Sequence, residues 1–152
     1  VQPYIRIGEL VISTGAVRED GTSKMYVGEN YPAVPDLELT STIIKTCREL
    51  GFPHYSGLTR SHDSFYIDHE DELMTYWNKK NILSSDMETG VIFTLAQLRG
   101  VKAASILNTV VEYASDVKDG IGEYVDEEAE AMEGERREII LVLESIVRIE
   151  KN

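Results

Sequence analysis

The residues best suited to chemistry lie at 84–90, which read Ser-Ser-Asp-Met-Glu-Thr-Gly. An apolar run at 91–96 follows at once and has the composition of a buried helix. Glu88 would therefore sit where a rigid helix begins, with a carboxylate able to bind the hydroxyls of a sugar. Alternatively, Asp86 and Glu88 only complement the positive end of the helix dipole, an effect of about 0.3–1 kcal/mol. These seven residues leave both interpretations open.

Other polar clusters give no metal signature. His62, Asp63, Asp68 and His69 lie close together but do not match zinc spacings such as His-Glu-x-x-His, and no cysteine pair supports them. The acidic run at 116–128 lacks the Asp-x-Asp/Asn-x-Asp/Asn-Gly pattern of a calcium loop. We therefore predict no metal site.

Composition narrows the possible functions. The 152 residues, 42% hydrophobic and 28% charged, are typical of a single globular domain. The net charge of −12 and the lack of a Lys/Arg cluster argue against nucleic acid or an anionic membrane as partners. No apolar run reaches the ~18 residues of a membrane span. Cys47, the single cysteine, is expected to be buried and structural, and the lack of disulfides indicates the cytoplasm.

Strands and helices alternate along the chain. We predict strands at 9–17, 54–60 and 101–111, and helices at 36–50, 70–80, 87–99 and 124–150. This alternation indicates an α/β fold. The strand at 101–111 lacks polar alternation, so we expect it to be central, parallel and buried on both faces. Ligands of such sheets bind beyond the carboxyl ends of the strands, so 61–69, 84–90 and the loop after Val111 should line a crevice.

Five segments follow one another in a recognisable order: Val-Gln-Pro at 1–3, Gly-Glu-Leu-Val-Ile at 8–12, Ala-Val-Arg-Glu-Asp-Gly at 16–21, Tyr-Pro-Ala-Val-Pro-Asp at 31–36 and Gly-Leu-Thr-Arg-Ser-His-Asp-Ser-Phe-Tyr at 57–66. Together they resemble the middle of a bacterial uridine phosphorylase. Asp-Met-Glu-Thr at 86–89 is similar to the Glu-Met-Glu-Ser signature of that family. The resemblance is collinear to about Val111.

The resemblance implies a nucleoside phosphorylase fold, a mixed sheet flanked by helices, assembled as a homo-oligomer (a dimer or a hexamer built of dimers). It implies that phosphate, with no cofactor, attacks the ribose anomeric carbon of a nucleoside and releases the base. By the same resemblance, Glu88 holds ribose hydroxyls and is the catalytic carboxylate, and Met87 packs the sugar. Phe65 lies against the base or the ribose, and Val110 and Val111 line the base pocket.

Two departures from the family pattern leave questions open. His69 and Asp71 stand where the uridine enzymes have the Gln and Arg that read the uracil edge, so His69 is expected at the base but the base itself is undetermined. The family's N-terminal phosphate loop is not in this sequence. We therefore expect residues 1–152 to be one α/β domain, the C-terminal part of an enzyme that acts only at full length. A non-catalytic nucleoside-binding relative and a purine-nucleoside phosphorylase are the alternatives.

Overall fold

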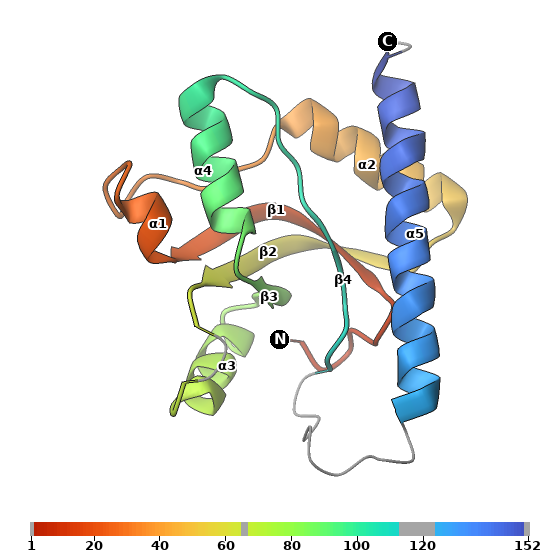
Figure 1. Cartoon of the computed structure of the whole chain (residues 1–152), viewed down its shortest axis with the longest axis horizontal. Coiled ribbons are helices and arrows are strands. Elements are labelled where there is room, and N and C mark those ends of the chain that lie inside the picture. The colour runs from red at the N-terminus through yellow and green to blue at the C-terminus, as the bar shows by residue number, and fades with distance from the viewer. Residues whose placement is uncertain (1, 65–66, 113–123, 151–152) are drawn as a thin grey trace.

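The computed structural model describes residues 2–64, 67–112 and 124–150, with side chains in the last segment described from residue 128. Its elements, in chain order, are β1 (Leu10–Glu19), α1 (Gly21–Lys24), α2 (Leu37–Leu50), β2 (His54–His62), α3 (Glu70–Asn78), β3 (Ser84–Asp86), α4 (Thr89–Arg99), β4 (Ile106–Asn108) and α5 (Tyr124–Glu150). In Figure 1, α5 runs along one side of the sheet, while α1 and α4 lie toward its other end. Among the described residues, no helix is both long and apolar enough to cross a membrane.

The four strands form one mixed sheet in the order β3-β2-β1-β4. β1 and β2 are parallel, as are β2 and β3, whereas β4 runs antiparallel to β1 through the pair Ile12 and Ile106 and its two neighbours. The predicted α/β fold with a mixed sheet is confirmed. The predicted central parallel strand at 101–111 is wrong, because only Ile106–Asn108 form a strand, which is half-buried at the sheet edge.

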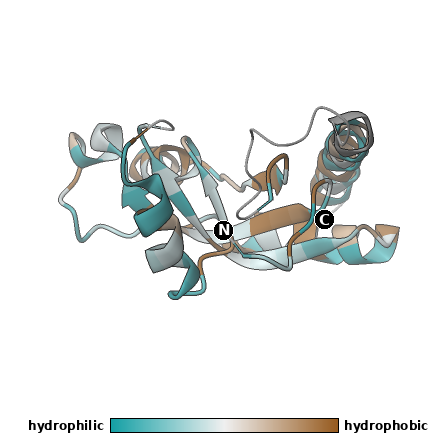
Figure 2. Cartoon of the chain, turned by 90° about the horizontal axis from the view of Figure 1, so that it is seen from below, coloured by the Kyte–Doolittle hydropathy of each residue, from teal (hydrophilic) through white to brown (hydrophobic). Residues whose placement is uncertain are grey.

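The hydrophobic core lies between β1, α2 and α5. Leu10 and Ile12 from β1 meet Ile43 and Cys47 from α2 and Leu141 from α5, all of them buried. Figure 2 shows hydrophobic residues gathered in the strands at the centre. The prediction of a buried, structural Cys47 is confirmed, and burial raises the pKa of its thiol to about 11, which keeps it protonated and unreactive at neutral pH.

Helix α5 contacts the sheet through a face other than its most apolar one. The residues that make its sequence look hydrophobic are exposed: Ile139, Val142, Leu143, Ile146 and Val147. Leu141 and Ser145 are buried instead. Large apolar side chains therefore remain uncovered along α5 in the described part of the chain.

Arg18 organises the segment that follows β1, where the sequence predicts only a long loop. Its side chain donates from Nε to Ser23 Oγ at 2.8 Å and from Nη1 to the carbonyls of Gly28 and Tyr31 at 2.9 and 2.7 Å. Asp20 caps the short helix α1 by accepting a hydrogen bond from the backbone N–H of Ser23. One buried guanidinium thus holds residues 28–31 against the strand through backbone atoms.

Gly134 allows α5 to approach the sheet closely. A Cβ atom at this position would lie 2.0 Å from Asn108 Oδ1 and 2.6 Å from the Cα of Gly8. The Asn108 amide also donates from Nδ2 to the carbonyl of Ala131 at 2.8 Å. A glycine, unfavourable within a helix by about 1 kcal/mol, is therefore required here by packing.

We predict that Gly134→Ala lowers the free energy of unfolding by about 1–3 kcal/mol, because overpacking outweighs the better helix propensity of alanine. Urea unfolding followed by circular dichroism measures the change. Gly28→Ala is the control, because no atom lies within 4 Å of a Cβ at that site. Equal stability of Gly134→Ala and the wild type would contradict the packing argument.

Candidate active site

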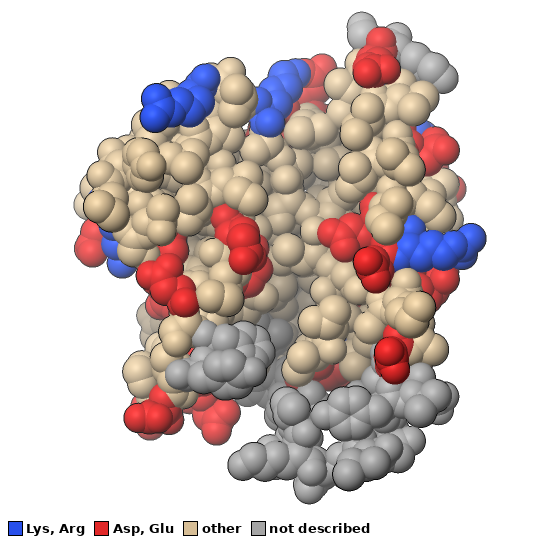
Figure 3. Space-filling model, in the orientation of Figure 1, with Lys and Arg blue, Asp and Glu red and all other residues tan. Residues whose placement is uncertain are grey.

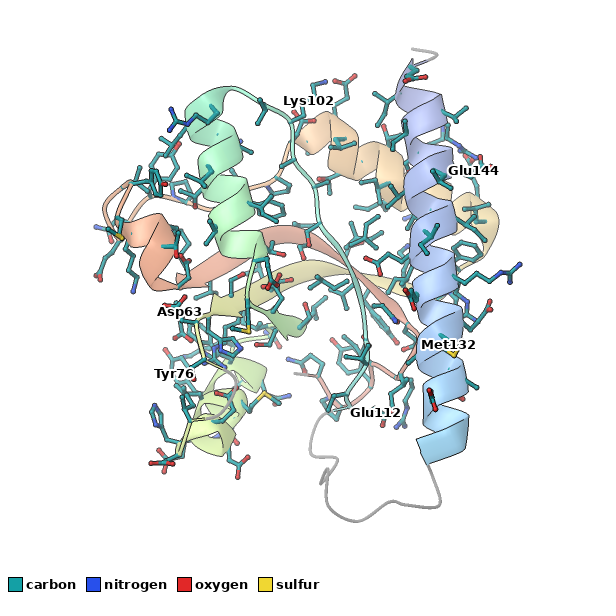
Figure 4. The ribbon with its side chains drawn as sticks, in the orientation of Figure 1. Asp63, Tyr76, Lys102, Glu112, Met132 and Glu144 are labelled. Carbon is teal, nitrogen blue, oxygen red and sulfur yellow. The ribbon has the colours of Figure 1, made fainter. Side chains whose placement is uncertain are left out.

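A cavity of about 790 Å³ opens between the sheet, α3 and α5. Residues 84–88 from β3 and the turn after it line one side, and residues 106–112 line another. Figure 3 shows acidic side chains on both sides of a central depression on this face. In Figure 4, Glu112 follows β4 and Met132 projects from α5 at the lower part of the molecule, and both line the cavity. Segments far apart in the sequence therefore share one opening.

The carboxyl ends of β2 and β3 lie next to each other because the two strands are parallel neighbours, although the sequence does not predict β3 as a strand. Their last paired residues are Ser61 and Asp86, and the cavity is lined by His62 after the one and by Met87 and Glu88 after the other. β4 runs in the opposite direction, so the end of this strand does not join theirs. Residues 109–111 nevertheless reach the same cavity from its other side.

Asp86 forms the junction between β3 and α4. One carboxylate oxygen, Oδ2, accepts from the Thr89 backbone N–H at 2.9 Å and from the Thr89 hydroxyl. The other, Oδ1, accepts from Ser61 Oγ at 2.5 Å. Ser61 Oγ in turn accepts from the backbone N–H of Gly90 at 2.7 Å. The first two backbone donors of α4, those of Thr89 and Gly90, are thus satisfied by Asp86 and Ser61, as helix capping requires.

The side chain of Glu88 takes no part in capping α4. Glu88 is the N-cap residue of α4 by its backbone, but its side chain makes no capping hydrogen bond. Its carboxylate is exposed, lines the cavity and accepts only from the Met87 backbone N–H, at 3.1 Å from Oε2, in the described structure. α4 begins at Thr89, two residues later than predicted, because Asp86 still belongs to β3. Capping by Asp86 weakens the interpretation in which Glu88 serves only the helix end.

A chain of hydroxyl groups runs beneath the site across all four strand segments. Ser84 on β3 bonds Thr59 on β2 at 2.9 Å between the side-chain oxygens, and Thr59 bonds Ser13 on β1 at 2.6 Å. Ser13 donates to Ser105 ahead of β4 at 3.4 Å, and Ser105 bonds Thr89 at 2.8 Å. Thr89 leads back to Asp86. The polar backing of the cavity is therefore a connected network that fixes β3 and α4 together.

The remaining predicted site residues are only partly brought together. Val110 and Val111 line the same cavity as Met87 and Glu88. His69 is exposed and does not line the cavity in this structure. Phe65 lies outside the described residues. The roles of these side chains in ligand binding stay predictions.

The described lining is strongly acidic. Seven of its residues carry carboxylates: Glu70, Asp86, Glu88, Glu112, Glu128, Glu135 and Glu138. No lysine or arginine is among the described residues that line it. Burial and the nearby charge of Glu135 raise the pKa of Glu138 above the ordinary carboxyl value. No group of three metal-ligating side chains was found in the described part of the chain.

Comparison with known proteins identifies the family. The model of the phosphorylase superfamily matches residues 1–148. The chain belongs to the phosphorylase superfamily. The crystal structure of uridine phosphorylase from Vibrio fischeri superposes on 97% of the chain and 59% of that structure, with a TM-score of 0.89 and 44% identity. The nucleoside phosphorylase fold that the sequence predicts is thereby confirmed.

Two curated relatives extend the comparison. The uridine phosphorylase of Thermococcus kodakarensis is 32% identical over an alignment of 92% of this chain and 54% of the relative. The guanosine phosphorylase of Halorubrum lacusprofundi is 35% identical over 70% of this chain and 44% of the relative. The chain thus spans about half the length of the curated relatives it matches.

Sequence reasoning missed several residues of the site. Glu70 and Met74 line the cavity from α3, whereas the sequence pattern indicated only their neighbours His69 and Asp71. Glu135 and Glu138 reach it from α5. The spacing of Glu70 and Met74, four residues apart on a helix, is a signal that they share a face. No comparable signal shows which face of α5 meets the cavity.

We predict that Asp86→Ala destabilises the fold by about 1–2 kcal/mol, since it removes the cap of α4. Asp36→Ala is the matched control, because Asp36 caps α2 by accepting from the Leu39 N–H at 2.8 Å, away from the cavity. Both variants should lose similar stability in urea unfolding. Only Asp86→Ala should also weaken the binding of a nucleoside, measured by calorimetry, because Glu88 lies two residues after Asp86 at the cavity. Equal binding by the two variants would show that the cap does not hold Glu88 in place.

We predict that Glu138→Gln stabilises the protein at pH 7. The raised pKa means that the folded state holds the proton more tightly than the unfolded state, so stability is highest below the ordinary carboxyl pKa of ~4.3 and falls as pH rises through the raised value. The advantage of the variant should therefore shrink at acid pH. Urea midpoints at pH 7 and pH 4 measure it, with exposed Glu144→Gln on the same helix as control (Figure 4). If Glu138→Gln gained the same stability at pH 7 and at pH 4, the raised pKa of Glu138 would not be the cause of that gain.

Proposed function

We propose that this chain is the C-terminal, sugar- and base-binding part of a nucleoside phosphorylase, with phosphate as co-substrate and no cofactor. The reaction cleaves the N-glycosidic bond of a uridine-like nucleoside into free base and ribose 1-phosphate. The observation that carries the proposal is the Glu88 carboxylate, released from helix capping by Asp86 and exposed at the cavity. The match to the phosphorylase superfamily along residues 1–148 supports it.

Glu88 suits this chemistry because charge develops on the sugar. As the glycosidic bond breaks, the ribose ring gains oxocarbenium character, which a nearby carboxylate stabilises. The two oxygens of Glu88 would accept hydrogen bonds from the ribose hydroxyls and fix the ring for attack at its anomeric carbon. Met87, 40% exposed beside it, offers an apolar surface to the sugar. Val110 and Val111 supply an apolar wall for the base.

The phosphate needs cations that the described lining does not contain. A dianion beside seven carboxylates would be repelled unless arginine or lysine side chains approach it. We propose that these side chains come from the rest of a full-length enzyme or from a second subunit of a homo-oligomer. The buried, unpaired Cys47 is compatible with a reducing compartment, so we propose the cytoplasm as the location.

A purine nucleoside is the second candidate substrate. The guanosine phosphorylase of Halorubrum lacusprofundi is 35% identical to this chain over the aligned part, compared with 32% for the uridine phosphorylase of Thermococcus kodakarensis. His69 and Asp71 also depart from the uracil-reading pair of the uridine enzymes, and an aspartate cannot donate as an arginine does. A nucleoside-binding relative without catalysis is the third candidate.

We predict that Glu88→Ala lowers kcat/KM of the whole protein by about 10²–10⁴, because two charge-assisted hydrogen bonds to the ribose are lost. Base release in the presence of phosphate is the measurement. Glu38→Ala is the control, since Glu38 is an exposed acid in the first turn of α2 that pairs with Lys102 and does not line the cavity. Similar turnover in the two variants would remove Glu88 from the ribose site.

The same assay separates the three candidates. Faster phosphorolysis of uridine supports the leading proposal, whereas faster cleavage of inosine or guanosine supports the purine enzyme. Calorimetric binding of a nucleoside without base release, at any phosphate concentration, supports the non-catalytic relative. No binding and no cleavage would contradict all three.

A further inference from the structure

Helix α3 forms one wall of the cavity although it is shallowly packed. Glu70 and Met74 line the cavity from this helix. None of its nine residues is buried in the described structure. In Figure 1 the helix lies apart from the other helices, beyond the end of β2. Its place relative to the sheet therefore depends on specific contacts at its two ends as well as on the half-buried Leu73, Met74 and Trp77.

Arg60 supplies the contact at the start of α3. Its side chain is only 2% exposed, and its guanidinium lies between two carboxylates. Nε donates to Glu19 Oε2 at 2.5 Å, and Nη1 donates to Glu70 Oε1 at 2.8 Å. Glu19 ends β1 and Glu70 begins α3, while Arg60 itself lies on β2. One buried cation thus connects two adjacent strands to the first residue of the helix.

Glu70 depends strongly on this cation. Its second oxygen, Oε2, is buried and has no hydrogen-bond partner in the described structure. Removing one partner of a buried ion pair leaves an uncompensated charge, which is far more costly than the pair itself is favourable. Without Arg60, Glu19 and Glu70 would lose the cation that they share and would repel one another as like charges. The start of α3 would then move outward to return its carboxylate to water.

The other end of α3 is held by neutral groups. Gln2 Nε2 donates to the carbonyl of Asn78 at 3.0 Å and to that of Ile82 at 2.8 Å. Asn78 Nδ2 donates back to Gln2 Oε1 at 3.2 Å. Loss of the ionic contact would leave this end in place. The expected motion is therefore a swing of the N-terminal half of α3, which bears Glu70 and Met74.

We infer that Arg60 is a positioning residue for base binding, which acts through Glu70 by fixing α3 as the wall of the cavity opposite β4. The inference rests on the proposed function, in which this cavity holds the nucleoside. Arg60 does not line the cavity and touches no reacting atom. Its loss should therefore weaken nucleoside binding more than it slows the chemical step.

The first experiment measures steady-state kinetics of the whole protein with Arg60→Met. We expect KM for the nucleoside to rise at least about tenfold while kcat changes by less than about threefold, the pattern of lost ground-state binding. Arg60→Lys should lie between, because an ammonium keeps the charge but lacks the planar, forked donor geometry with which the guanidinium bonds Glu19 and Glu70. Arg18→Met is the matched control: Arg18 is a buried arginine on neighbouring β1, bonded to carbonyls and outside the cavity lining. An equal KM in Arg60→Met and Arg18→Met would overturn the inference.

The second experiment does not need activity. Hydrogen exchange of the backbone amides of α3 reports how firmly the helix is held. Protection should fall in Arg60→Met but not in Arg18→Met, and Arg60→Met with Glu70→Gln should recover part of it because the repulsion is gone. Unchanged protection of α3 in Arg60→Met overturns the inference. A wild-type protein that cleaves no nucleoside refutes the proposed function, while this comparison still decides whether Arg60 fixes α3.

Discussion

The hydrogen bonds of the Asp86 carboxylate are the interaction on which the site depends. They end β3, begin α4 and attach both to Ser61 at the end of β2. Because a carboxylate has several acceptor positions, Asp86 on β3 can satisfy donors from both β2 and α4 at once. The residue two positions later is then left without a structural task. Glu88 is available for chemistry because the side chain of Asp86 caps the helix in its place.

The hydroxyl chain behind Asp86 gives this junction its rigidity. Serine and threonine can each donate and accept, so Ser84, Thr59, Ser13 and Ser105 link strands that apolar side chains would only pack together. Such a network has few alternative arrangements when each member is satisfied. The apolar core lies elsewhere, where β1 packs against α2 and α5. Packing thus gives the domain its stability, and the polar network gives the site its geometry.

Much of the fold was predictable from local patterns, and the errors have physical causes. Helix α2 was predictable because Asp36 caps it and Gly51 ends it in a left-handed conformation. The run at 101–111 was misjudged because an apolar sequence does not reveal whether its partners are strands or helices. Glu88 was recognisable from a motif, whereas Glu70 and Arg60 required knowledge of which segments meet. Charge pairs between residues ten or more apart leave no periodic pattern in a sequence.

Arg18 holds residues 28–31 through their carbonyl oxygens rather than through their side chains. Every amino acid has a carbonyl, so the arginine imposes a path on the chain without requiring particular residues along that path. Residues 28–31 are therefore free to diverge in sequence while keeping their shape. That surface therefore tolerates substitution of its own residues, but it does not tolerate the loss of Arg18.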